Sequence, residues 1–159
     1  MNRIDAGSSS STADLEEGTA LKLDFEKLQD IVKGESDVIP VAVQDSDTKE
    51  VLIVAYVNDE ALAYTLSHGV AAFWSTSRNE LWVKGATSGD KLELVDVRVN
   101  CEQNSLLYLV RPLGAGACHT RGADGNARSG CFYRRIDRGD SAEDGPVDRS
   151  SRSWRLTFV

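Results

Sequence analysis

The sequence predicts an α+β protein with a mostly antiparallel sheet and two short helices. Runs of β-forming residues follow one another along most of the chain, and brief polar turns typical of hairpins separate several of them. Only two segments space their apolar residues as a helix does. The sequence has neither a regular alternation of strands with helices nor a glycine-rich phosphate loop, which disfavours the parallel nucleotide-binding folds.

The two helices are expected in residues 21–34 and residues 58–69. In the first, apolar side chains recur every three or four positions and form one stripe. The members of that stripe are Leu21, Phe25, Leu28 and Val32. The second helix begins with Asn58 as its N-cap and ends before Gly69. His68 lies in its last turn, where a cationic residue suits the helix dipole, and is interpreted as a capping residue.

Eight runs rich in β-branched and aromatic residues are expected to form strands. They are residues 38–45, 51–57, 71–77, 80–85, 91–102, 106–112, 131–136 and 154–159. A polar turn joins the first run to the second, the third to the fourth and the fifth to the sixth. Each of these three pairs is therefore predicted to be an antiparallel hairpin.

One folded domain is expected, because 159 residues can bury one proper core but are too few for two ordinary domains. Residues 1–20 are serine-rich, acidic and without periodicity, and they are predicted to form a disordered tail. The domain is placed at residues 21–138, a polar linker at residues 139–152 and a terminal strand at residues 153–159.

The net charge and the hydropathy pattern restrict the partners and the location of the protein. A net charge of -7 argues against a general binder of nucleic acid or anionic membranes, since both reward a basic surface. A small phosphorylated substrate in a local basic pocket remains compatible with this charge. No apolar run is long enough to span a bilayer, and the N-terminal residues lack the apolar core of a secretory signal, so a cytoplasmic location is expected.

The three cysteines, Cys101, Cys118 and Cys131, do not suggest a disulfide framework, because their number is odd and no export signal precedes them. Their spacings of seventeen and thirteen residues fit no short zinc knuckle or ribbon. Burial as a small apolar side chain is the simplest interpretation of each thiol taken singly. Cys118, however, is expected in a loop beside His119, and three thiolates with one open position would make a catalytic zinc site.

Two further features can carry chemistry. His119, beside a candidate metal ligand, is a candidate general acid or base, although a loop histidine bonded to backbone explains it equally well. Residues 73–91 concentrate hydroxyls, glycines and fixed cations, which a phosphate group requires. They include Ser75, Thr76, Ser77, Arg78, Lys84, Thr87, Ser88 and Gly89. A polar hairpin without a ligand is the alternative interpretation of this stretch.

The run that begins at residue 91 continues its strand-like alternation into the sequence RVNCEQN. Because successive side chains of a strand point to opposite faces, one face is expected to be apolar and the other polar. The apolar face would hold Val95, Val97, Val99 and Cys101. The polar face would hold Asn100, Glu102 and Asn104, with the last placed least firmly because a bend follows.

Four motifs together resemble one enzyme family. The chain contains FWSTSRNELWVKGATSGDK, VRVNCEQNSLLYLV, GAGACHT and CFYRR in the order, and close to the spacing, of phosphoribosyl-AMP cyclohydrolase, an enzyme of histidine biosynthesis. The resemblance covers about residues 23–136. It implies an intertwined homodimer in which three cysteines from both subunits hold zinc, and a magnesium site on an Asp-Cys-Asp-x-Asp strand. The implied reaction adds water at C6 of N1-phosphoribosyl-AMP and breaks the N1–C6 bond.

The resemblance also assigns roles to individual residues. It implies that Cys101, Cys118 and Cys131 are zinc ligands, and His119 aligns with a histidine of the family. It implies a substrate-binding set that comprises Trp74, Ser75, Ser77, Arg78, Lys84, Thr87, Ser88 and Gly89. The expected cofactors are Zn²⁺ and, at the second site, Mg²⁺. The expected partners are a small phosphorylated nucleotide and a second copy of the chain, with no nucleic acid and no membrane.

The chain departs from the family pattern at the magnesium strand. Asn100, Glu102 and Asn104 stand at the three aspartate positions, and two amides with one carboxylate should bind a hard dication far more weakly. Glu102 is a second candidate for the catalytic base. His119 is preferred, because the strand pattern places Glu102 on the face away from Cys101.

Two other departures concern the candidate catalytic residues. Val83 replaces a family histidine in a Trp-His-Lys-Gly sequence, and the loop between Cys118 and Cys131 is longer than the usual form. The leading hypothesis is a zinc-dependent phosphoribosyl-AMP cyclohydrolase. The alternatives are a paralogue that acts at C6 of another purine nucleotide, and a zinc-stapled dimer that binds a nucleotide without turning it over.

Overall fold

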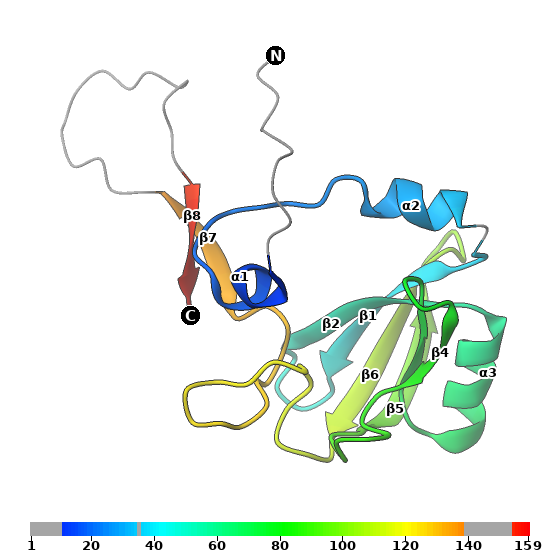
Figure 1. Cartoon of the computed structure of the whole chain (residues 1–159). Helices are drawn as coiled ribbons and strands as arrows, with labels where there is room; N and C mark the ends of the chain where they lie inside the picture. The colour runs from blue at the N-terminus through cyan, green and yellow to red at the C-terminus, as the bar shows by residue number, and fades with distance from the viewer. Residues whose placement is uncertain (1–10, 35, 139–153) are drawn as a thin grey trace. The chain divides into compact units, whose positions relative to one another are not determined.

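The computed structural model describes residues 11–34, 36–138 and 154–159 (Figure 1). The chain divides into two compact units. The larger unit runs from Phe25 to Tyr133, and the smaller unit combines the described residues up to Asp24 with those from Arg134 onward. The fold is α+β with mostly antiparallel strand pairs, as the sequence predicts.

A four-stranded sheet with the order β2-β1-β6-β5 organises the larger unit. Its strands are β1 (Ile39–Asp45), β2 (Val51–Val57), β5 (Leu92–Val99) and β6 (Leu106–Pro112). The hairpins β1–β2 and β5–β6 confirm two of the predicted antiparallel pairs. β1 and β6 pair in parallel, with Val43 opposite Tyr108, and this central pairing joins the two hairpins.

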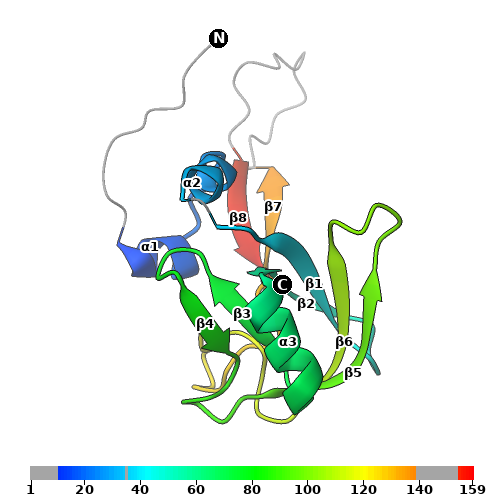
Figure 2. The same cartoon turned by 90° about the vertical axis from the view of Figure 1, so that its right-hand side faces the viewer.

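The third predicted hairpin is formed by β3 (Ala72–Ser75) and β4 (Glu80–Val83), and it is separate from the main sheet. Asn79 closes its turn with a φ of 53°, a conformation that asparagine tolerates better than most residues. Helix α3 (Asp59–His68) lies beside this hairpin (Figure 2). These two elements cover one face of the sheet and close the core.

The ends of α3 follow the sequence prediction. The side-chain oxygen of Asn58 accepts a hydrogen bond from the Ala61 backbone N–H at 2.9 Å, and Gly69 ends the helix with a φ of 67°. The His68 ring stacks on Tyr64 at a centroid distance of 3.8 Å, and its Nδ1 lies 3.0 Å from the Tyr64 carbonyl oxygen. The contacts of His68 are thus made with the last turn of its own helix.

The core fills the space between the four-stranded sheet, α3 and the β3–β4 hairpin. Its buried members are Val41, Val43, Leu52, Ile53, Val57, Ala61, Ala71, Phe73, Leu92, Leu106, Tyr108, Val110 and Ala117. Phe73 lies between the Trp82 ring at 5.3 Å and the Tyr108 ring at 6.1 Å, measured between centroids. Because Trp82 packs against this core and also lines the cavity of the candidate site, the same core supports that site.

The first predicted helix is shorter than expected. Helix α2 covers only Lys27–Lys33, and residues 21–26 precede it without helical structure. Phe25, Leu28 and Val32, three members of the predicted apolar stripe, are exposed, whereas Ile31 is buried. The predicted stripe was wrong because the orientation of so short a helix is determined by the one side chain that is buried, Ile31, and not by the spacing of its apolar residues.

The smaller unit contains α1 (Thr12–Glu17), β7 (Arg134–Arg138) and β8 (Trp154–Phe158). The prediction of disorder was wrong for α1. Ser11 and Asp14 form a capping box at its start, with the Ser11 hydroxyl 3.2 Å from the Asp14 backbone nitrogen and an Asp14 carboxylate oxygen 3.3 Å from the Ser11 nitrogen. A serine-rich sequence therefore starts a helix here.

The β7–β8 pair differs from the predicted domain plan. β7 lies inside the predicted domain of residues 21–138, but it pairs with β8 and belongs to the smaller unit. β8 occupies the predicted terminal strand, and Arg134 donates to the carbonyl oxygens of Leu15 at 2.6 Å and Gly18 at 2.8 Å. The predicted linker, residues 139–152, lies outside the described residues. Within the described part of the chain, no helix has the length and apolarity required to cross a membrane.

A buried hydroxyl connects α3 to the β3–β4 hairpin and can be tested. The Thr65 Oγ1 donates to the Ala61 carbonyl oxygen at 2.9 Å and accepts from the Ala72 backbone N–H at 2.9 Å. We expect Thr65→Val to lower the free energy of unfolding by about 1–3 kcal/mol, because the Ala72 N–H is left buried without an acceptor. Thr65→Ser, which keeps the hydroxyl, should cost less in the same urea titration. Equal losses would contradict this account.

Candidate active site

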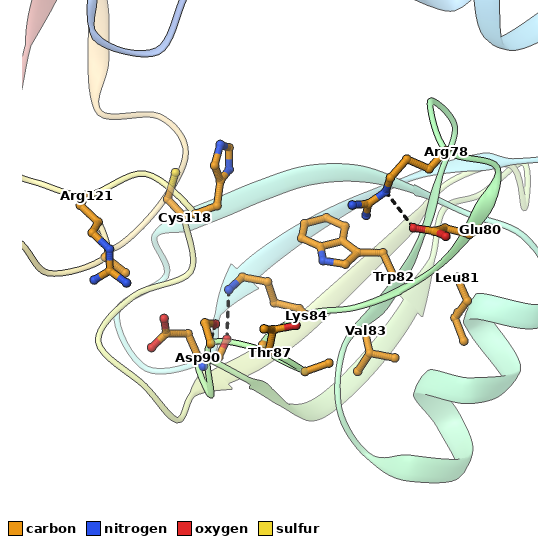
Figure 3. A pocket seen from close by; sticks show the side chains of 15 residues that line it. Arg78, Glu80, Leu81, Trp82, Val83, Lys84, Thr87, Asp90, Cys118 and Arg121 are labelled. Atoms are coloured by element: carbon orange, nitrogen blue, oxygen red, sulfur yellow. Dashed lines mark hydrogen bonds and ion pairs between the residues drawn. The ribbon is translucent and has the colours of Figure 1, made fainter. Parts of the chain in front are cut away.

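A cavity of about 470 Å³ lies between β4, the loop that follows β4, and the loop that contains Cys118 (Figure 3). Its lining combines cations, hydroxyls, an indole, a thiol and an imidazole. The lining residues are Arg78, Glu80, Leu81, Trp82, Val83, Lys84, Gly85, Ala86, Thr87, Ser88, Asp90, Cys118, His119, Arg121 and Ala127. Such a mixture of polar and aromatic groups around a concave space is typical of a small-molecule site.

The loop after β4 presents its hydroxyls to the cavity because two glycines allow a tight turn. Gly85 has a φ of 79° and Gly89 a φ of 83°, both in the left-handed region that glycine adopts readily. A Cβ atom on Gly85 would lie 2.4 Å from the Asp90 carbonyl carbon, so no larger residue fits there. The turn places Thr87 and Ser88 on the cavity wall.

The loop between Cys118 and Cys131 is closed by its own backbone pairing. The Ala117 N–H donates to the Ser129 carbonyl oxygen at 3.0 Å, and the Cys118 N–H to the Arg128 carbonyl oxygen at 3.1 Å. The Cys131 N–H donates to the Leu52 carbonyl oxygen of β2 at 2.7 Å. This pairing brings the two thiols into electrostatic contact although they lie thirteen positions apart in the sequence. The loop is therefore a hairpin, which explains why the spacing matches no short zinc motif.

Asp90 connects the two loops, and the sequence analysis did not identify it. Its carboxylate oxygen accepts from the Ala115 N–H at 3.0 Å, while its carbonyl oxygen accepts from the Lys84 ammonium at 3.0 Å (Figure 3). A Cβ atom on Gly114 would lie 2.2 Å from that carboxylate oxygen, so the approach of the two loops requires glycine. A single aspartate after a glycine-rich turn carries no motif that would reveal this role.

Cys118 is buried, with 3% of its surface exposed, and its sulfur is in contact with polar groups of Thr120. The Thr120 Oγ1 lies 3.0 Å from Cys118 Sγ, and the Thr120 backbone N–H donates to the same sulfur at 3.4 Å. The Arg128 guanidinium donates to the Thr120 hydroxyl oxygen at 3.0 Å and lies 4.0 Å from the Tyr133 ring centroid. A guanidinium group can donate but cannot accept a hydrogen bond, so the Thr120 hydroxyl proton is not used by Arg128 and can point at the sulfur.

Lys84 and the two thiols influence one another. Burial lowers the pKa of Lys84, and the nearby Asp90, Cys131 and Cys118 partly oppose that effect. Burial, with a further contribution from Cys118, raises the pKa of Cys131 to about 12. The raised pKa means that the Cys131 thiol resists ionisation unless a cation is nearby, and two adjacent thiols fit a soft or borderline metal such as zinc.

The structure brings together half of the eight predicted substrate-binding residues. Arg78, Lys84, Thr87 and Ser88 line the cavity with Cys118 and His119. Trp74, Ser75, Ser77 and Gly89 are not among the lining residues. The Ser75 hydroxyl instead accepts from the Arg78 backbone N–H at 3.4 Å and lies 3.4 Å from the Ser77 hydroxyl, so these serines shape the β3–β4 turn.

The prediction of one strand over residues 91–102 is wrong at its C-terminal end. β5 ends at Val99, and Asn100–Asn104 form a turn in which Gln103 has a φ of 56°. A bulge between Leu94 and Asp96 shifts the register, and the predicted apolar face is buried only in part, with Val97 packed against the core. Val95 and Val99, which that face was expected to bury, are 47% and 56% exposed.

The polar side chains of this turn bind one another. The Asn100 side-chain oxygen accepts from the Asn104 and Ser105 backbone N–H groups, both at 2.9 Å. The Asn100 amide donates to the Asn104 side-chain oxygen at 2.7 Å, and the Asn104 amide donates to Glu102 at 3.1 Å. The oxygens that would face a cation are already acceptors, and the two amides add no negative charge. This turn does not fit a magnesium site.

Cys101 and Glu102 belong to that turn and do not line the cavity. β6 separates the turn from the Cys118 loop, and a seven-residue strand spans about 20 Å (Figure 1). Among the described residues, no group of three histidine, cysteine or acidic side chains is arranged to hold a metal ion. A single chain thus supplies two adjacent thiols at one end of β6 and a third at the other.

The chain is similar to known proteins over most of its length. A family profile for phosphoribosyl-AMP cyclohydrolase matches residues 53–133. The chain is 46% identical over 114 residues to the phosphoribosyl-AMP cyclohydrolase of Hyphomonas neptunium, covering 72% of this chain and 82% of that protein. It is 50% identical over 103 residues to that of Archaeoglobus fulgidus, covering 65% and 89%. The Roseobacter denitrificans protein of the same name is 40% identical over 131 residues, covering 82% and 94%.

The closure of the cysteine loop gives a testable prediction. A Cβ atom on Gly116 would lie 2.3 Å from the Arg128 carbonyl oxygen, so Gly116→Ala must open the pairing that buries Cys118. We expect the Cys118 thiol to react roughly tenfold faster with a thiol-specific reagent such as DTNB, because local opening controls its access. Gly122→Ala is the matched control, since its nearest neighbour is a side-chain oxygen of Asp124 at 3.1 Å. Equal rates in both variants would contradict the prediction.

Proposed function

The chain belongs to the phosphoribosyl-AMP cyclohydrolase family, and on that premise we propose that it opens the adenine ring of N1-phosphoribosyl-AMP, a step of histidine biosynthesis. Water would add at C6 and the N1–C6 bond would break. The observation that carries this proposal is a single cavity lined by a buried thiol (Cys118), an imidazole (His119), a buried ammonium (Lys84) and an indole (Trp82). A purine nucleotide requires groups of these kinds.

We propose that zinc is held by Cys118 and Cys131 of one chain and by Cys101 of a second copy. The adjacency of Cys118 and Cys131 supports the first part, and the length of β6 supports the second, because Cys101 cannot reach the pair from the same chain. Bound zinc would lower the pKa of a water molecule so that hydroxide is available near neutral pH. The cysteine pair thus predicts a homodimer whose sites are shared.

His119 is the residue proposed to move protons. It is exposed, it follows Cys118 directly and it lines the cavity, whereas the other histidine, His68, is bonded at the end of α3. As the bond from oxygen to C6 forms, His119 would take a proton from water and return it to N1 as the C–N bond breaks. Val83 occupies the wall where the family has a histidine, so His119 has no second imidazole beside it from that position.

The remaining lining residues bind and orient. Trp82 can stack on the purine ring, and Thr87 with Ser88 can donate hydrogen bonds to phosphate or ribose oxygens. The Lys84 ammonium is held at 3.0 Å from the Asp90 carbonyl oxygen and is close to both thiols. It therefore offsets part of the negative charge of a thiolate pair.

The proposed function is tested by ring opening of N1-phosphoribosyl-AMP, followed by absorbance, with zinc-loaded protein. We expect turnover by the native chain and none by Cys118→Ser or Cys101→Ser alone. If each site combines both subunits, mixing the two variants should restore up to about a quarter of native activity, because half of the dimers are mixed and each has one intact site.

Two results would contradict parts of this proposal. Failure of the mixture to regain activity, with zinc bound to each chain separately, would exclude the shared site. Binding of AMP without turnover of N1-phosphoribosyl-AMP would favour a paralogue or a nucleotide-binding protein. Val83 is the reason to test for this outcome, because it replaces a histidine of the family pattern.

We also propose that the Asn100–Asn104 turn holds its shape without Mg²⁺. The double variant Asn100→Asp, Asn104→Asp should be less stable by about 1–3 kcal/mol without Mg²⁺, because carboxylates cannot donate the two amide hydrogen bonds and repel one another. Its Tm should rise when Mg²⁺ is added, whereas the Tm of the native chain should not change. A rise of several degrees in the native chain would contradict this proposal.

A further inference from the structure

The cavity has a cation at each end. Arg78 lies at one end and Arg121 at the opposite end, with Trp82, Lys84 and Cys118 between them (Figure 3). Arg78 comes from the β3–β4 hairpin, whereas Arg121 comes from the loop between the two adjacent cysteines. The two guanidinium groups are therefore positioned by independent parts of the larger unit.

The charges in the cavity differ in how they are compensated. Arg78 forms a salt bridge with Glu80 at 2.9 Å, a weak one because both side chains are more than half exposed, and the carboxylate of Asp90 accepts from a backbone N–H. Arg121 donates to the Gly125 carbonyl oxygen at 2.9 Å and forms no salt bridge within the described part of the chain. A neutral carbonyl holds this guanidinium in place and leaves its charge available for an anion.

The local backbone fixes Arg121. Residues Arg121 and Ala127 form a β-bridge, and the Gly122 N–H donates to the Asn126 carbonyl oxygen at 2.9 Å. The turn between them is held by Asp124, which accepts from the Asn126 backbone at 3.0 Å and from its side-chain amide at 3.1 Å. A guanidinium on such an ordered loop is preorganised to bind a phosphate bidentately.

We propose that Arg121 binds the phosphate of the phosphoribosyl group attached to N1 of the substrate, and that Arg78 binds the phosphate of the AMP part. This inference rests on the proposed function. N1 is bonded to C6, the carbon that water attacks, so the N1 substituent must lie at the reacting end of the cavity, where Cys118 and His119 are. The AMP phosphate is attached through N9 on the other side of the purine and extends toward the opposite end.

Arg121 is thus the residue that distinguishes the substrate from AMP, which has no N1 substituent. The loop that carries it is also the one that is longer than the usual form. A residue that binds a remote phosphate equally in the ground state and the transition state changes KM and leaves kcat unchanged. This pattern separates Arg121 from a residue needed only for the shape of the loop.

The test compares Arg121→Gln, Arg78→Gln and the native chain, with calorimetry for AMP and steady-state kinetics for N1-phosphoribosyl-AMP. We expect Arg121→Gln to raise the KM roughly ten- to hundredfold with kcat and AMP affinity within about twofold of native. Arg78→Gln should weaken both AMP and the substrate. Arg121→Lys should recover part of the loss, because it restores the charge without the bidentate geometry.

Arg111→Gln is the control, because this exposed arginine pairs with Asp47 and Glu93 and does not line the cavity. An unchanged KM in Arg121→Gln, or an equal loss of AMP affinity, would overturn the assignment. If the native chain does not turn over N1-phosphoribosyl-AMP, the proposed function fails. The assignment of Arg121 is then decided by calorimetry with the unreacted compound, which should still bind the native chain more tightly than Arg121→Gln.

Discussion

The candidate site depends on one residue that accepts two hydrogen bonds. Asp90 binds Lys84 through its carbonyl oxygen and the backbone of Ala115 through its carboxylate, so it fixes the substrate loop and the cysteine loop to each other. Neither loop contains regular strand or helix along the part that faces the cavity. This connection keeps the ammonium and the buried thiol on neighbouring segments, and the Leu113 N–H, which donates to the Lys91 carbonyl oxygen at 2.9 Å, pairs the adjoining backbone. The glycine at position 114 is part of the same constraint, because it lets the second loop approach.

Local sequence patterns predicted the fold where short-range interactions determine it. The three hairpins and α3 follow from alternation, polar turns and capping residues that act within a few positions. The parallel pairing of β1 with β6 was not predictable, because it joins segments about sixty residues apart for which no local pattern exists. The end of β5 was missed for a different reason. The turn that follows it is held by side-chain amides. The alternating pattern predicts Asn100 as a strand residue, because the pattern does not reveal the hydrogen bonds that its side chain makes.

The placement of the candidate site was predicted in part. Arg78, Lys84, Cys118 and His119 were identified because their chemistry is distinctive, and the structure gathers them around one cavity. Asp90 and Thr120 act through hydrogen bonds to groups that the sequence does not reveal as neighbours. The position of Cys101 could not be predicted from the sequence of one chain. Its sequence neighbours predict a ligand, but β6 holds it away from the other two thiols.

The turn that carries Cys101 has a consequence for the conditions under which the protein can keep its shape. Amide side chains do not titrate, so the bonds between Asn100 and Asn104 persist through changes of acidity that would protonate a set of carboxylates. Only the contact with Glu102 involves an ionisable group. If the turn keeps its shape without Mg²⁺, as proposed, it presents its cysteine in the same geometry whether or not divalent ions are present. The position of one thiol would then not depend on the supply of such ions.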